Sequence, residues 1–123
     1  EAFMHVALGN YTVSSKITGM MAEGIDPGKI EKSETNRKKI VEALKKSFEV
    51  VNQAVMNASE ADFDKKVDFF GMDMNVLDMI MLGATHQHEL LGQQIAYARM
   101  NGVTPPWTAE MQKKMKEQQK KGN

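Results

Sequence analysis

The three histidines are the residues of this chain best suited to chemistry, because imidazole ligates metals and exchanges protons near neutral pH. They are His5, His86 and His88. His86 and His88 are two residues apart in a segment with a helical pattern, whereas residues on one helical face are three or four apart. These two side chains point in roughly opposite directions and cannot share a ligand. A site at His86 therefore needs a partner from another element.

Several other kinds of site are excluded or disfavoured. The chain has no cysteine, which excludes disulfides, zinc-thiolate sites and a thiol nucleophile. Its aspartates match no calcium-loop spacing, and Ser14 and Ser15 show no nucleophile-elbow pattern. Sixteen basic residues balance sixteen acidic ones, and the Lys-rich tail lacks interleaved aromatic residues. We therefore expect neither a nucleic-acid nor a membrane partner.

The elements that must position the histidines are predicted to be helices. A first helix is expected over 1–23, ended by Gly24, and a second begins at a cap on Ser33 or Thr35. Intervals of three and four predict the buried stripe of the second helix. That stripe comprises Ile40, Val41, Leu44, Phe48, Val51 and Val55.

The segment after the second helix is predicted to be irregular. Ser59 is expected to cap a short turn of helix, and "VDFFG" reads as an extended or looped connector. Phe63, Phe69 and Phe70 are predicted to close one end of the core by packing. No pair of strands is evident, so the predicted fold class is all-α.

The longest helix is predicted from Asn75 to Met100 or Asn101, with Gly102 as its stop. A last helix is expected to start at Thr108. The long helix has two apolar faces, whereas a surface helix usually has one. One face holds Met79, Leu82, His86, Leu90, Gln93 and Tyr97, and the other holds Leu77, Met81, Ala84, His88, Leu91, Ile95 and Ala98. Two such faces predict a homodimer.

The stretch "HQHELLGQQIAYARMNGVTPPW", together with "FMHVALGNY" near the start, resembles the DinB-like superfamily. Nearly the whole chain to Trp107 takes part in the resemblance. It implies an up-down four-helix bundle, commonly dimeric, with a divalent metal such as zinc or nickel on three histidines. Family members usually have a complete helix before the first histidine block. The chain is therefore expected to be an N-terminally incomplete bundle over 1–107, followed by a polar helical tail over 108–123.

Residue by residue, the resemblance implies two metal ligands, His5 and His86. The third histidine is expected at position 90, where this chain has Leu90. A catalytic zinc normally keeps three protein ligands, so the site is expected to be degenerate. Glu89 and Gln93 are the candidate substitutes. The alternative is a pair of buried histidines hydrogen-bonded to Tyr11, Tyr97 or Gln93.

Two functions follow from these observations. The favoured one is a DinB-like bundle that acts by dimerisation or by binding a small apolar ligand in a Met-rich pocket, although the eleven methionines also suit core filling. The alternative is a divalent-metal-dependent enzyme, such as a transferase of a low-molecular-weight thiol, whose substrate site includes Gln93, Tyr97 and Arg99. No apolar run approaches the roughly 18 residues of a membrane span, so a cytoplasmic protein is expected.

Overall fold

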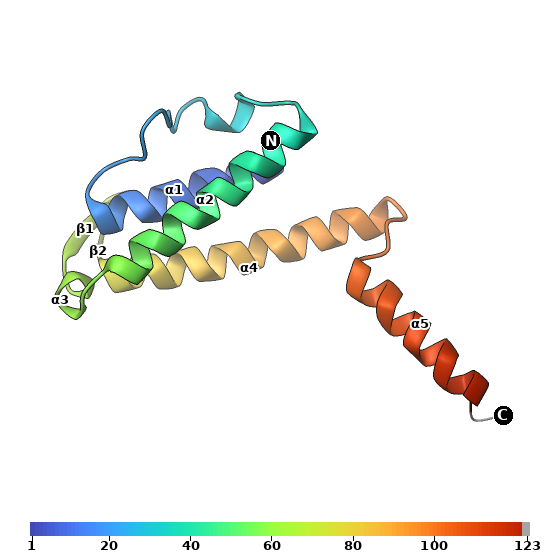
Figure 1. Cartoon of the computed structure of the whole chain (residues 1–123). Helices are drawn as coiled ribbons and strands as arrows, with labels where there is room; N and C mark the ends of the chain where they lie inside the picture. The colour runs from blue at the N-terminus through green and yellow to red at the C-terminus, as the bar shows by residue number, and fades with distance from the viewer. Residues whose placement is uncertain (122–123) are drawn as a thin grey trace. The chain divides into compact units, whose positions relative to one another are not determined.

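The computed structural model describes residues 1–121, and these are mostly helical, in agreement with the predicted all-α class. The chain divides into two compact units, Glu1–Gln87 and the part from His88 onward, so the division lies within one helix. The elements in order are α1 (Ala2–Thr18), the 3-10 helix η1 (Ile30–Lys32), α2 (Arg37–Asn57), α3 (Glu60–Phe63), β1 (Lys66–Phe69), β2 (Met72–Asn75), α4 (Val76–Met100) and α5 (Pro106–Lys121) (Figure 1).

Helix α1 ends five residues earlier than predicted. Its C-cap is Gly19, which has a φ of 80°, and the Gly19 N–H donates to the Ser15 carbonyl at 2.8 Å. Gly24 also has a positive φ, 76°, but it lies in the following loop. Glycine is favoured where a helix ends in the left-handed conformation, because it has no Cβ to clash. The prediction chose the wrong one of two glycines.

Helix α2 is capped by Asn36, and not by Ser33 or Thr35 as predicted. The Asn36 Oδ1 accepts hydrogen bonds from the backbone N–H groups of Lys38 at 3.0 Å and Lys39 at 3.3 Å. Glu34 supports this cap, since its carboxylate accepts from the N–H groups of Asn36 and Thr35. These hydrogen bonds lower the pKa of Glu34, and the bond from the Asn36 N–H lowers it most. Serine, threonine and asparagine all favour this position, so residue type alone does not choose between them.

The buried side of α2 also differs from prediction. Its fully buried residues are Ser47 and Ala54, whereas Val41 is 44% exposed and Phe48 is 39% exposed. The side that faces α1 is thus built partly from small residues, which let two helices approach closely. Ile40 and Leu44 of the predicted stripe do pack against the core, so the prediction is correct for part of the stripe only.

A short antiparallel hairpin separates α3 from α4, so the prediction that no strands pair is wrong. Ser59 does cap α3, as predicted, through a reciprocal capping box with Asp62. The two strands pair from Lys66 opposite Asn75 to Phe69 opposite Met72. The connecting residues Phe70 and Gly71 have φ values of 53° and 76°, the pattern of a two-residue type I′ turn. Strand β1 alternates between exposed and half-buried residues, but four residues are a short signal, and the burial of β2 does not alternate.

Helix α4 begins and ends where the sequence predicts. The Asn75 Oδ1 accepts from the Asp78 N–H at 2.8 Å, and the Asp78 carboxylate accepts from the Asn75 N–H at 2.9 Å. At the other end Gly102 has a φ of 74°, and the N–H of Val103 donates to the Ala98 carbonyl at 2.9 Å. Helix α5 starts at Pro106, two residues before the predicted cap. Proline suits the first helical turn because it lacks the N–H that would have no partner there.

The core of the first unit lies along α1. Met4, Ala7 and Tyr11 cluster with Ile30 of η1, and all four are buried. Burial raises the pKa of the Tyr11 hydroxyl. Figure 1 shows α1 and α2 side by side, with the loop that carries η1 returning along them.

A buried polar chain joins three helices of the first unit. The Asn10 amide donates to the Ser47 hydroxyl at 3.0 Å, and the Gln87 amide donates to the Asn10 Oδ1 at 2.7 Å. The Ser47 hydroxyl itself donates to the Leu44 carbonyl at 2.7 Å. Buried polar groups are costly unless bonded, so this chain of bonds holds α1, α2 and α4 in one register.

None of the helices in residues 1–121 is long and apolar enough to cross a membrane.

Candidate functional site

The fold brings together the two histidines that the family resemblance selected. His5 of α1 and His86 of α4 lie with their ring centroids 5.4 Å apart and their planes at 77°, an edge-to-face arrangement. Gly9 lies opposite His86, and a Cβ at position 9 would be 3.5 Å from the His86 Cδ2. Both histidines are partly exposed and not fully buried. His5 and His86 are 81 residues apart in the chain but form one pair in space.

His5 has an unexpected partner, Glu31 of η1. The His5 Nδ1 and the Glu31 Oε1 are 2.6 Å apart, and both side chains are about two-fifths exposed. A carboxylate oxygen accepts, so in the neutral imidazole Nδ1 carries the proton and Nε2 keeps its lone pair. The partner of His5 is thus Glu31 and not Tyr11, while bonds to Tyr97 or Gln93, which belong to the second unit, stay a prediction. Its neighbour Ile30 is buried in the core and holds the 3-10 turn in place.

The remaining predicted site residues belong to the second unit. Gln93 donates to the Glu89 carboxylate at 3.5 Å, one helical turn away. Leu90 is 8% exposed, and His88 is exposed. The role of Glu89 or Gln93 as a substitute ligand stays a prediction.

The side chains do not fit a resident metal centre of the expected kind. Residues 1–121 contain no group of three or more His, Cys, Asp or Glu side chains that is arranged to hold a metal ion. His5 and His86 supply two imidazoles, and the nearby Glu31 bonds to His5 itself. A catalytic zinc typically needs three protein ligands plus an open position.

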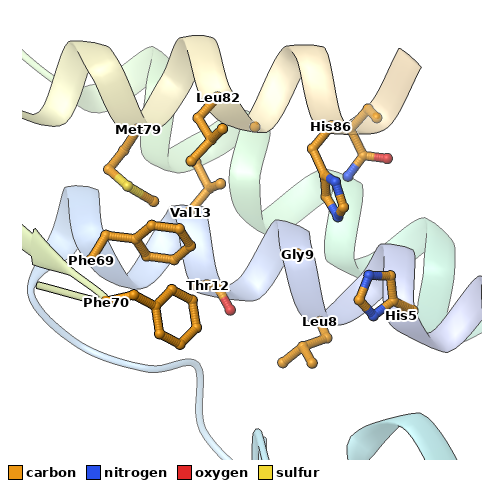
Figure 2. A pocket seen from close by; sticks show the side chains of 12 residues that line it. His5, Leu8, Gly9, Thr12, Val13, Phe69, Phe70, Met79, Leu82 and His86 are labelled. Atoms are coloured by element: carbon orange, nitrogen blue, oxygen red, sulfur yellow. The ribbon is translucent and has the colours of Figure 1, made fainter. Parts of the chain in front are cut away.

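A pocket of about 360 Å³ opens beside the two histidines. Figure 2 shows His5 and His86 at one end and the hairpin residues Phe69 and Phe70 at the other. The walls between them come from α1 and α4, through Leu8, Gly9, Thr12, Val13, Met79, Leu82, Gly83 and Gln87. A concave, mostly apolar space with a few polar groups is the usual form of a small-ligand site.

The hairpin tip gives the pocket an aromatic end. The rings of Phe69 and Phe70 lie 4.6 Å apart at 67°, edge to face. Phe70 is 88% exposed, so the prediction that it closes the core by packing is wrong. Its place at the tip of a two-residue turn leaves the side chain largely open to solvent while it still lines the pocket. The dipeptide "FG" at 70–71 is a weak signal for such a turn, since Asn-Gly or Asp-Gly is the usual sequence.

One close contact, between Gly83 of α4 and Val13 of α1, shapes the walls of the pocket. A Cβ at Gly83 would lie 2.8 Å from the Val13 Cγ2, so a glycine is needed at this point of α4. Met79 is only 1% exposed and contributes to the pocket wall from the same helix. No lysine, arginine, aspartate or glutamate is among the described residues that line the pocket. The site thus combines apolar walls, two imidazoles and no fixed charge.

Comparison of the chain with protein-family models, with curated proteins and with solved structures finds no match. Membership of the DinB-like superfamily accordingly stays a prediction.

Proposed function

We propose that this chain is a DinB-like helical protein that binds a small apolar ligand in the pocket between His5, His86 and the Phe69–Phe70 turn. The observation that carries the proposal is the pocket itself, about 360 Å³ and lined mainly by apolar side chains from three elements. Its size falls within the range of small-molecule sites, roughly 300 to 1,000 Å³. Two imidazoles at one end offer the few polar contacts that orient a ligand.

The DinB-like part of the proposal is supported by how the predicted motifs lie. The two histidine-bearing segments of the resemblance lie on α1 and α4, and their matched histidines form a pair. Leucine at position 90 removes the third histidine, which supports a degenerate metal site in which the two imidazoles have become polar contacts for a ligand.

Binding of a neutral fluorescent probe, N-phenyl-1-naphthylamine, tests the proposal. A Thr12→Phe variant places a ring in the pocket and should lower probe affinity at least tenfold. Met56→Phe adds the same ring at a position of α2 that is 83% exposed and outside the pocket, and should leave affinity unchanged. Binding that is absent in the unmodified protein, or that is equally affected by both variants, would overturn the proposal.

The same protein is proposed to form a homodimer through α4. Leu77 is 47% exposed and Met81 is 59% exposed, and both lie on the second apolar face that the sequence predicts. Burying such a face is favourable, by roughly 25 cal/mol per Å². Sedimentation of Met81→Lys against the unmodified protein tests the dimer. A monomer in both, at micromolar concentration, would contradict it.

The alternative is a divalent-metal-dependent enzyme, for example a thiol transferase. The His5–Glu31 bond favours it, because a carboxylate behind a histidine is a common support for a metal ligand. Metal analysis of dialysed protein, with zinc and nickel titration, decides between the two. One tightly held equivalent that His5→Ala abolishes would establish the metal reading, and no binding would remove it.

A further inference from the structure

The pocket specifies more than an apolar ligand. We infer that it selects neutral aromatic molecules that carry a hydroxyl group, with the ring against Phe69 and Phe70 and the hydroxyl donating to the Nε2 of His5. This inference rests on the proposed ligand-binding function and names the class of ligand. Three observations carry it: the charge of the lining, the bond between His5 and Glu31, and the backbone at Phe70.

The lining disfavours a charged ligand. Twelve residues surround the pocket, and among these described residues there is no lysine, arginine, aspartate or glutamate. An ion that enters such a space loses its water without gaining a counter-charge, which is costly. Glu31, bonded to His5 just outside the lining, adds negative charge near that end and further disfavours a carboxylate or phosphate. A neutral ligand avoids both costs.

The polar end offers a hydrogen-bond acceptor. Glu31 engages the His5 Nδ1 at 2.6 Å and so keeps the proton on that nitrogen. In the neutral imidazole the other ring nitrogen, Nε2, then has a lone pair and no hydrogen. A hydroxyl can donate to this lone pair, whereas an ether, a ketone or a plain hydrocarbon cannot. The Glu31–His5 pair therefore favours a ligand that brings a donor.

The opposite end offers an aromatic surface at an energetic cost to the fold. Phe70 is the only non-glycine residue with positive φ in residues 1–121, and its ring is 88% exposed. A bulky residue is disfavoured in this conformation, and asparagine or glycine is usual in such turns. Strain of this kind marks positions where the side chain itself is needed. The paired Phe69 and Phe70 rings suit edge-to-face or offset contact with a third ring.

The pocket extends from the two histidines at one end to the two phenylalanines at the other. Leu8 and Thr12 of α1 and Leu82 of α4 line the space between the phenylalanines and the histidines (Figure 2). A flat molecule can run along these walls with its ring at the hairpin and its polar group at His5. Two fused rings with one hydroxyl make a simple probe of this form.

The test compares three fluorescent probes with one ring system: 2-naphthol, naphthalene and 2-naphthoate. At pH 7 the unmodified protein should bind 2-naphthol at least fivefold more tightly than naphthalene and at least tenfold more tightly than 2-naphthoate. His5→Phe removes the acceptor but keeps a ring, and should reduce the naphthol-to-naphthalene ratio to about one. Phe70→Asn suits the turn and removes the ring, and should weaken 2-naphthol tenfold. Met56→Ala is the surface control.

The outcomes separate the two proposals. Equal affinity for 2-naphthol and naphthalene, or tightest binding of 2-naphthoate, would overturn the ligand class while ligand binding itself stands. A naphthol preference that survives His5→Phe would overturn the role of His5. Failure of every probe, N-phenyl-1-naphthylamine included, would overturn ligand binding as well. Circular dichroism of each variant confirms that it is folded.

Discussion

Two sides of α1 differ in how far their side chains are buried. On one side Met4, Ala7 and Tyr11 are almost fully covered, and Asn10 is bonded to two other helices. On the other side Leu8 and Thr12 are only partly covered and face the pocket. Both sides belong to the same helix and are equally regular in backbone. Val6 and Val13 of the same helix are buried as well, so in the middle of α1 only the strip along the pocket is left partly covered.

The largest expected effect breaks the packed side. Asn10→Ala removes the group that bonds both Ser47 and Gln87 in the interior, and should lower the free energy of unfolding by about 2 to 3 kcal/mol. Thr12→Ala, on the pocket side, should change it by less than about 0.5 kcal/mol. Urea unfolding of both variants measures the contrast. Equal losses would show that the two sides of α1 are not different in this way.

A smaller effect probes how closely the pocket walls approach. Gly83→Ala places a Cβ 2.8 Å from a methyl of Val13, whose branched side chain has few rotamers. Overpacking should lower the free energy of unfolding by about 1 to 3 kcal/mol, whereas the better helix propensity of alanine should raise it by roughly 1 kcal/mol. We expect a net loss of about 1 kcal/mol in urea unfolding.

The matched control lies on the same helix. A Cβ at Gly92 meets no heavy atom within 4 Å, so Gly92→Ala should stabilise α4 through propensity alone. Adding Val13→Ala to Gly83→Ala should recover part of the loss, as a double-mutant cycle would show. A stabilising Gly83→Ala would mean that Val13 yields without cost.

The hairpin turn should respond in the opposite direction. Phe70→Asn places a residue that tolerates positive φ where Phe70 is strained, and should raise the free energy of unfolding by about 0.5 to 1 kcal/mol while probe binding falls. Thermal unfolding and probe titration on the same samples measure both quantities. A variant that is less stable would show that the Phe70 ring supports the fold and is not held there for a ligand.

The smallest effect concerns pH and the packed side. Burial raises the pKa of Tyr11 in the folded state above its ordinary value of 10.0. The contribution of Tyr11 to stability is therefore fully present below pH 10. It falls as the pH rises toward the folded pKa, because the unfolded chain releases the Tyr11 proton first. Tyr11→Phe should remove this part of the alkaline slope in urea unfolding between pH 9 and pH 11. An unchanged slope would show that Tyr11 does not contribute.

Local signals in the sequence predicted much of the secondary structure. Ser59, Asn75 and Gly102 were identified correctly as a cap, a cap and a stop, because each acts through bonds to residues within a few positions. Where several residues of equal preference stood together, as at Ser33, Thr35 and Asn36, the local signal did not choose. The buried residues Ser47 and Ala54 of α2 were missed because they are small, and apolar bulk is what periodicity detects.

For the candidate site, the sequence by itself identified His5 and His86 through their motifs and placed His86 and His88 on different faces of one helix. Only the tertiary structure paired His5 with Glu31, added Phe69 and Phe70, and enclosed a pocket between them. Helix phase follows from spacing along the chain, so the sequence determines it. His5 contacts Glu31, 26 residues away, and His86, 81 residues away. These contacts depend on how the loops return and which helix faces pack, and no local preference encodes them.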